Sequence, residues 1–381
     1  MKTIGIKLGL LFVLCTGSWL TLTSCSKDGD ADSGSQSVQP SFEASVDTIF
    51  EGEQMSFVNT INSTADVAYY WDFGDGATSI AENPSHTFDA VGNYVVTLTT
   101  TVQGTETSVA KEVGVYRHEL ENRPGLVTYM ESLNGNIMVC AHRMYHNVLP
   151  ENSMSALNAS IEAGIGMVEI DIRQTKDGEL VLLHDSTLDD TTTGSGDLTD
   201  YLLEELGQFY LYKADGSLSN EHIPTFKEIL EVARGNIYID IDVKMENYLK
   251  IYQLVKQYGM LSQCMFTTDE LSVCQSLQNA DSKTILFPIV REETDYAAYT
   301  LTGLDIRIFQ LNSDMSQNQT VVDDILANGD FFFANIYINS NVTPQSNNYV
   351  QVNNFINLGG SIIQTDYPVT LKSYLQNLNL N

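Results

Sequence analysis

Basic residues are scarce in this chain of 381 residues. Lysine and arginine together number 19, against 49 aspartates and glutamates, and the formal net charge is -30 at pH 7. Because phosphate backbones are bound by positively charged surfaces, this balance excludes nucleic acid as an expected partner. The acidic excess is instead typical of a well-solvated exterior.

Cysteine is too rare for a fold built on disulfides. There are five cysteines, and Cys15 and Cys25 fall within the first 25 residues. Cys140, Cys264 and Cys274 lie in apolar segments and are predicted to be buried thiols. One disulfide between two of these three cysteines is compatible with the sequence, although their odd number argues against a disulfide framework.

A hydrophobic run long enough to suggest a membrane-spanning helix is also missing. Residues 8–22 are mostly apolar, but the run is short and no basic stop follows it. Lys2 and Lys7 precede this run, which makes the segment typical of a secretion signal.

The end of this signal, Leu22-Thr23-Ser24-Cys25, resembles a bacterial lipobox. The resemblance implies removal of residues 1–24, lipidation of Cys25 and a membrane anchor at the N-terminus. An ordinary secretion signal with a chance cysteine is the alternative. The mature chain would have 381 − 24 = 357 residues and a net charge near −30 − 2 = −32. We expect it in the cell envelope, at the outer membrane, with the periplasmic face and the cell surface both open.

The mature chain is long enough for two domains, joined to the anchor by a tether. Residues 25–40 are polar and acidic and predict a flexible tether. Residues 41–116 contain short runs of period two, separated by turn residues, which predict a β-sandwich. Its motifs W-D-F-G-D-G (71–76) and P-S-H-T-F (84–88) resemble those of the polycystic-kidney-disease (PKD) domain, which has an immunoglobulin-like fold. That resemblance implies a spacer, which we favour over a carbohydrate- or protein-binding module.

After a connector at 117–136, the pattern changes to alternating strands and helices, which predicts a parallel sheet in residues 137–381. Eight apolar β-type runs alternate with eight segments of helical period. This count, in 381 − 136 = 245 residues, predicts a TIM (β/α)8 barrel, so the fold class is α/β. No glycine-rich phosphate loop follows the first strand to favour an open doubly wound sheet.

Polar residues cluster at the predicted carboxyl ends of these strands, where a TIM barrel has its active site. Alternating residues of a strand share a face, so neighbours two apart in sequence point to the same side. The candidates are His142 and Arg143 after the first strand, Glu169 and Asp171 on the second, His184 after the following hairpin, Asp240, Asp242 and Lys244 on the third, and Asp366 after the eighth.

This set suits cleavage of a phosphodiester. Glu169 and Asp171, with Asp242 or Asp240, offer hard oxygen ligands for one divalent cation, Ca²⁺ or Mg²⁺. Arg143 and Lys244 are predicted to bind the phosphate oxygens. Histidines titrate near neutrality, so His142 and His184 suit the acid and base roles, with the order left open. Attack by water and attack by a neighbouring glycerol hydroxyl are both compatible with this set.

The same residues carry a resemblance to the glycerophosphodiester phosphodiesterase family. The matching motifs are His142-Arg143, Pro150-Glu151-Asn152-Ser153, Glu169-Ile170-Asp171, Thr175-Lys176-Asp177-Gly178, His184-Asp185, Thr191–Gly196, Ile223–Leu230 and Thr365–Pro368. The resemblance implies a TIM barrel, a Ca²⁺ or Mg²⁺ ion, and hydrolysis of glycerophosphodiesters to glycerol 3-phosphate and an alcohol. Glu151 and Asn152 would support the site.

Three positions depart from the family pattern. Met144 replaces a usual glycine, Asp242 replaces a usual glutamate ligand, and Asp190 replaces a frequent arginine. We expect Met144 to reshape the first loop and the shorter Asp242 to draw the ion toward the third strand, or to require water or Asp240. Two alternatives stay open: a phospholipase or a phosphodiesterase for inositol- or sugar-bearing diesters, and a non-catalytic surface binding lipoprotein.

Overall fold

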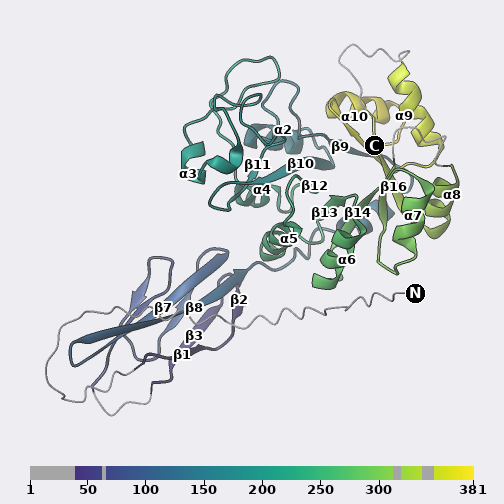
Figure 1. Ribbon diagram of the computed structural model, residues 1–381. Coiled ribbons are helices and arrows are strands. Elements are labelled where there is room, and N and C mark those ends of the chain that lie inside the picture. Colours follow the sequence, from purple (N-terminus) through teal and green to yellow (C-terminus); the bar gives the residue numbers. More distant parts are fainter. Residues whose placement is uncertain (1–38, 62–65, 312–318, 337–346) are drawn as a thin grey trace, which may run out of the picture. The chain divides into compact units, whose positions relative to one another are not determined.

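The computed structural model describes residues 39–61, 66–311, 319–336 and 347–381. The predicted signal, the predicted lipidation site Cys25 and most of the predicted tether lie outside these residues. The chain divides after Tyr116 into two compact units, each with its own core. The first is built of strands alone, and the second combines strands and helices (Figure 1).

The first unit is a sandwich of two sheets. One sheet has the order β1-β3-β6 and the other β2-β8-β7-β4-β5, in which β2 runs parallel to β8. The strands are β1 (Phe42–Ala44), β2 (Thr48–Phe50), β3 (Gln54–Asn59), β4 (Ala68–Asp72), β5 (Thr78–Ser79), β6 (Ser85–Thr87), β7 (Gly92–Val102) and β8 (Thr105–Tyr116).

Trp71 lies fully buried at the centre of the sandwich, with the rings of Phe42 and Phe57 against it. His86 stacks on Phe73 at 4.1 Å, and its Nε2 lies 2.6 Å from a carboxylate oxygen of Asp75. These contacts assign His86 to the packing of the sandwich.

The second unit is an eight-stranded parallel barrel. Its strands follow the order β10-β12-β13-β14-β15-β16-β17-β9, and β9 also pairs with β10, which closes the ring. They are β9 (Met138–Ala141), β10 (Met167–Gln174), β12 (Tyr238–Val243), β13 (Cys264–Thr268), β14 (Ile285–Val290), β15 (Ile308–Leu311), β16 (Phe331–Asn335) and β17 (Ile362–Thr365). The predicted TIM barrel is confirmed.

Helices follow the barrel strands and lie outside them (Figure 1). Ser153 and Thr225 cap two of these helices by accepting hydrogen bonds from the backbone N–H groups of Ala156 and Glu228. The helices are α2 (Met154–Glu162), α4 (Phe226–Ala233), α5 (Tyr248–Gln257), α6 (Leu271–Ala280), α7 (Glu293–Thr300), α8 (Gln319–Asn328), α9 (Asn347–Asn357) and α10 (Pro368–Asn377).

The segment expected as a connector contains the helix α1 (Leu126–Ser132), which belongs to the barrel unit. Leu126 and Met130 of α1 pack into one buried cluster with Met138, Met167 and other first residues of the barrel strands. Tyr238 on β12 adds a hydrogen bond from its hydroxyl to the Pro124 carbonyl. The helix therefore covers the N-terminal end of the barrel.

A hairpin interrupts the alternation after β10. The strand β11 (Leu180–Leu182) pairs antiparallel with the end of β10, through a turn at Lys176–Gly178. The following segment, up to α4, contains the 3-10 turn Leu198–Asp200 and the short helix α3 (Leu203–Leu206). A satellite apolar cluster that includes Leu188, Leu198 and Leu211 supports it.

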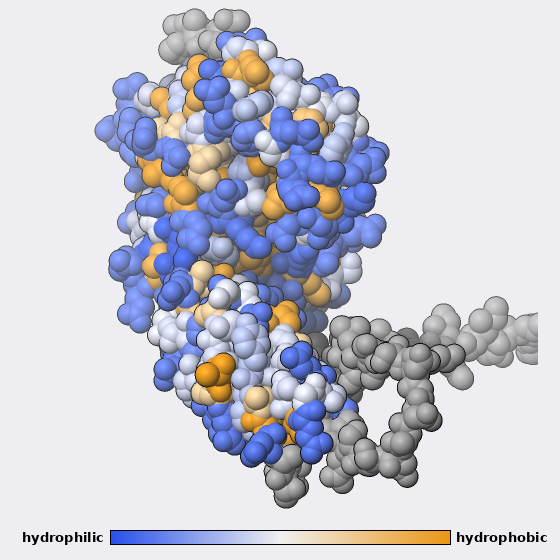
Figure 2. Space-filling model, turned by 90° about the vertical axis from the view of Figure 1, so that its left-hand side faces the viewer, coloured by the Kyte–Doolittle hydropathy of each residue, from blue (hydrophilic) through white to orange (hydrophobic). Residues whose placement is uncertain are grey.

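The surface fits the composition. Figure 2 shows a face on which hydrophilic residues predominate and hydrophobic ones are scattered. Among the residues that the structure describes, no helix combines the length and apolar character needed to cross a membrane. Cys140, Cys264 and Cys274 are free and buried, as predicted.

Candidate active site

The pleat of two neighbouring strands brings four carboxylates together. On β10, Val168, Ile170 and Ile172 are buried on the outer side, which turns Glu169 and Asp171 inward. In the parallel register, Glu169 lies beside Asp240 of β12, and Asp171 beside Asp242.

Three of these carboxylates can share one cation. Oxygen atoms of Glu169, Asp171 and Asp242 lie within 4.8 Å of one another, and the first two residues are buried. Carboxylate oxygens at this spacing fit a hard divalent ion such as Ca²⁺ or Mg²⁺. Asp240 lies outside this group, and its carboxylate instead accepts a hydrogen bond from the Thr267 hydroxyl.

The electrostatics of the cluster favour a bound cation. Burial raises the pKa of Glu169 well above its ordinary value, and repulsion from Asp171 and Asp240 raises it further. The pKa of Asp240 is also well above its ordinary value, chiefly because of burial, although the bond from Thr267 works in the opposite direction. Buried carboxylates placed this close need positive charge for all of them to be ionised.

Lys244 supplies part of that charge. Its Nζ lies 2.5 Å from a carboxylate oxygen of Asp242 and 3.2 Å from one of Asp171. Despite burial, which acts in the opposite direction, these two carboxylates raise the pKa of Lys244, so it stays charged. The predicted phosphate-binding lysine thus lies at the edge of the carboxylate group.

The loop after β9 completes this side of the site. The backbone N–H of Arg143 donates a hydrogen bond to the carboxylate of Glu169. The guanidinium Nη1 of Arg143 donates to both carboxylate oxygens of Glu151, each at 3.0 Å. The Nε of Arg143 lies 3.7 Å from Asp171 Oδ2. Asn152 donates to the same carboxylate and accepts from the Asp171 backbone N–H, so Glu151 and Asn152 both contact the site.

Met144 occupies a backbone conformation that favours glycine. Its φ is +70°, and that of Arg143 is +48°. The Met144 side chain is fully buried. The loop therefore has a backbone turn that glycine adopts readily, with the apolar Met144 side chain buried at that turn.

His142 is oriented by a residue from the last strand. Its Nδ1 lies 2.7 Å from a carboxylate oxygen of Asp366, directly after β17. Its Nε2 lies 4.0 Å from Glu169 Oε2, so this nitrogen faces the carboxylate group. Burial raises the pKa of Asp366, but the bond to His142 and the positive charge of His142, His146 and Arg143 together outweigh burial and leave the pKa below its ordinary value.

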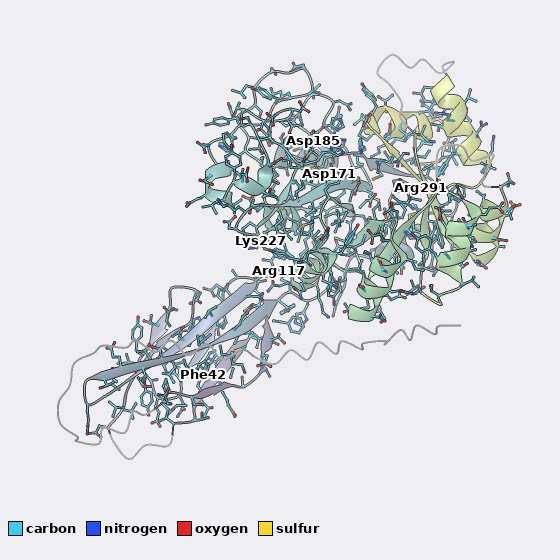
Figure 3. The ribbon with its side chains drawn as sticks, viewed as in Figure 1. Phe42, Arg117, Asp171, Asp185, Lys227 and Arg291 are labelled. Atoms are coloured by element: carbon cyan, nitrogen blue, oxygen red, sulfur yellow. The ribbon has the colours of Figure 1, made fainter. Side chains whose placement is uncertain are left out.

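His184 is held through both its side chain and its backbone. Its Nδ1 lies 2.8 Å from a carboxylate oxygen of Asp185. The guanidinium of Arg173 on β10 donates twice to the His184 carbonyl, at 2.9 and 2.6 Å, and once to the Lys244 carbonyl at 3.3 Å. Figure 3 shows Asp171 and Asp185 within this part of the barrel unit.

Sequence reasoning gave the cluster but missed several partners. Asp366 was placed only at the end of the eighth strand, and neither its bond to His142 nor the bond of Asp185 to His184 was predicted. Arg173 was overlooked although it lies two residues after Asp171, and the same alternation could have found it.

Sequence comparison supports this geometry. The profile of the glycerophosphoryl diester phosphodiesterase family matches residues 142–332, half of the chain. The chain belongs to this family. The profile of the PKD domain matches residues 37–115, which cover the sandwich. The resemblances of the barrel to this family and of the sandwich to the PKD domain are therefore confirmed.

Two curated relatives carry the family name. The chain is 33% identical over 130 residues to a glycerophosphodiester phosphodiesterase of Caldanaerobacter subterraneus subsp. tengcongensis, a match to 32% of this chain and 54% of that protein. It is 35% identical over 126 residues to glycerophosphodiester phosphodiesterase 1 of Bos taurus, which matches 32% of this chain and 38% of that protein. The chain thus spans about half or less of the length of these relatives.

Solved structures share the fold. A glycerophosphoryl diester phosphodiesterase from Parabacteroides distasonis superposes with a TM-score of 0.61 at 24% identity, over 67% of this chain and 93% of that one. An Oleispira antarctica phosphodiesterase, solved in complex with the product sn-glycerol-3-phosphate, gives a TM-score of 0.53 at 23% identity, over 65% of this chain and 99% of that one. At these identities the likeness concerns the fold alone.

Proposed function

We propose that the barrel hydrolyses glycerophosphodiesters to glycerol 3-phosphate and an alcohol with the help of one divalent cation. The observation that carries this proposal is the meeting of Glu169, Asp171 and Asp242 beside an oriented His142. Family membership supports the reaction class. The product complex of the Oleispira protein supports the choice of substrate.

Glu169, Asp171 and Asp242 would hold Ca²⁺ or Mg²⁺, which supplies Lewis-acid stabilisation of the phosphate charge. Arg143 and Lys244 border the same carboxylates and would add fixed positive charge at the phosphate oxygens. With Asp242 as ligand, the ion would lie toward β12, and the pairing of Asp240 with Thr267 argues against Asp240 as the third ligand.

His142 and His184 would exchange protons with the attacking and leaving oxygens. If Nδ1 of His142 donates to Asp366, its Nε2 is the nitrogen that takes or gives a proton. His184 has the same arrangement with Asp185. Both water and a neighbouring hydroxyl of the glycerol group are suitable nucleophiles for this pair.

The experiment that tests this function measures glycerol 3-phosphate release from glycerophosphocholine and glycerophosphoinositol by the chain without residues 1–24. We expect release with Ca²⁺ or Mg²⁺, loss of release with chelator, and at least a roughly 10²-fold lower kcat in His142→Ala and in His184→Ala. Near-full activity in either variant would remove that histidine from the mechanism. Metal binding without release from any diester would favour a non-catalytic binding protein.

We also propose that the protein is a lipoprotein of the cell envelope, anchored through Cys25, with the sandwich as a spacer. The lipobox-like sequence before Cys25 and the acidic residues after it support the anchor. Metabolic labelling with a fatty acid tests it: Cys25→Ser should abolish the label. A labelled Cys25→Ser variant would contradict the anchor.

A further inference from the structure

The barrel wall opposite the carboxylates carries amides at its C-terminal end. Along the closed ring, β15 is four strands from β10, and β16 is four strands from β12. In a ring of eight, four steps lead to the opposite side. Gln310 on β15 therefore faces the side of Glu169 and Asp171, and Asn335 on β16 faces the side of Asp242.

Ring contacts fix the direction of these two side chains. Phe309 contacts Tyr296 of the outer helix α7 at 5.2 Å, so its neighbour Gln310 points inward. Phe333 contacts Phe287 in the barrel interior at 4.8 Å, so Asn335, two residues later, points to the same side. Both amides thus lie above the apolar layer of the barrel, at the level where the catalytic side ends in carboxylates and histidine.

Asn335 is the informative member of the pair. Its Oδ1 is buried and has no hydrogen-bond partner among the residues that the structure describes. A buried acceptor without a partner destabilises a fold, and such groups usually meet a ligand or water. In the register, Asn335 lies beside Gln364, whose Oε1 is 3.9 Å from the Cys140 thiol.

The described strands on this side of the barrel also carry no charge. Strands β14–β17 contain no carboxylate and no cation, and the charged residues described directly after them are Arg291 and Asp366. Asp366 is hydrogen-bonded to His142. Arg291 forms an ion pair with Asp269 at 3.0 Å, and the side chains of these two residues are largely exposed. In Figure 3, Arg291 and Asp171 lie at different parts of the barrel unit. A quaternary ammonium is typically bound by an aromatic cage or a free carboxylate, and the described inward residues at the carboxyl ends of β14–β17 offer neither.

We propose that Asn335 and Gln310 form a hydroxyl-binding subsite for a neutral polyol group of the diester. An amide both donates and accepts, which matches the hydroxyl groups of glycerol, inositol or a sugar. The anionic phosphate would lie against the charged half of the barrel end and the polyol against the amide half. This inference rests on the proposed function and names the substrate class for the same site.

The test compares kcat/KM for three diesters: glycerophosphoinositol, glycerophosphocholine and bis(p-nitrophenyl) phosphate, which has no hydroxyl group. The variants are Asn335→Leu and Gln310→Leu, with Gln275→Leu on the outer face of α6 as the matched control. We expect Asn335→Leu to lower kcat/KM for glycerophosphoinositol about 10-fold, the effect of one hydrogen bond, and to leave bis(p-nitrophenyl) phosphate within about 2-fold. Its thermal midpoint should stay the same or rise, because an unpaired buried acceptor is removed.

Which diesters lose kcat/KM in Asn335→Leu identifies the polyol that the subsite binds. A loss limited to glycerophosphoinositol assigns the subsite to the alcohol, and an equal loss for both glycerophosphodiesters assigns it to the glycerol. No loss for either, or the same loss for the hydroxyl-free diester, overturns the proposal.

A binding measurement separates this inference from the proposed function. In a His142→Ala background with Ca²⁺, glycerophosphoinositol should bind about 10-fold more weakly when Asn335→Leu is added. If the native chain hydrolyses no diester, the proposed function fails while this titration still decides the subsite. Equal affinity of His142→Ala with and without Asn335→Leu overturns the subsite.

Discussion

At the scale of single residues, His142 is oriented by a partner from the C-terminal part of the domain's sequence. Asp366 lies 224 residues away in sequence and reaches Nδ1 only because β17 and β9 are neighbours in the closed ring. The sequence could place both residues at strand ends by their position after apolar runs. It could not pair them, because the pairing depends on barrel closure and on two side-chain rotamers.

Asp366→Asn tests this partnership. The amide keeps the shape but loses the charge that stabilises a protonated His142, so we expect kcat to fall roughly 10- to 10²-fold with KM nearly unchanged. Steady-state kinetics over a range of pH would measure it, with Asp324→Asn on the exposed side of α8 as the matched control. An unchanged kcat would mean that the bond to Asp366 is dispensable.

At the scale of elements, β10 shows how one strand supplies both core and chemistry. Its inward residues change from Met167 in the apolar base to Glu169 and Asp171 in the carboxylate group, and then to Arg173, which holds two neighbouring carbonyls. The sequence patterns predicted the order of strands and helices well, because the spacing of apolar residues along a strand or a helix follows directly from which of its faces is buried. Helix α1 was underestimated, since its seven residues are stabilised by packing on the barrel base, and local sequence does not reveal that packing.

Arg173→Met tests the role of that clamp. The backbone carbonyls of His184 and Lys244 would lose their shared donor, so we expect kcat to fall about 10-fold because the acid/base geometry loosens. Ca²⁺ binding, followed by thermal shift, should stay nearly unchanged. Arg173→Lys should restore only part of kcat, since lysine lacks the planar fork.

The matched control for this change is Arg307→Met. Arg307 is also paired, to Asp330, but precedes β15 at the opposite end of the barrel. If both variants lose activity equally, the effect of Arg173 is general destabilisation and not positioning.

At the scale of the whole molecule, the two units have separate cores and can be followed separately. The chain has two tryptophans, Trp19 in the expected signal and Trp71 in the sandwich core. Without residues 1–24, tryptophan emission therefore reports on the sandwich alone, while activity reports on the barrel.

This separation allows a pH prediction. Burial raises the pKa of Asp75, but the bond to His86 and the backbone N–H of Ala77 outweigh it, so the pKa lies below its ordinary value. A lowered carboxylate pKa contributes stability that is present above the ordinary pKa of about 4 and is lost as pH falls through the folded-state value. Asp75→Asn should thus lower the free energy of unfolding of the sandwich at pH 7 by about 0.5–1.5 kcal/mol, which urea denaturation followed by Trp71 emission would measure.

The difference between the native chain and Asp75→Asn should shrink as the pH is lowered to about 3. Phosphodiester hydrolysis at pH 7 should be equal in the two proteins. A midpoint difference that does not change with pH would mean that the charge of Asp75 contributes nothing to the sandwich.

The helix beneath the barrel has a kinetic consequence. Leu126 and Met130, with the methionine and aromatic residues above them, close the N-terminal end. In the proposed reaction, the diester, the released alcohol and glycerol 3-phosphate would then all pass through the other end, where Asp171 and His142 lie. For the proposed reaction, each product blocks the next substrate until it has left, so glycerol 3-phosphate should act as a competitive product inhibitor and slow turnover as it accumulates.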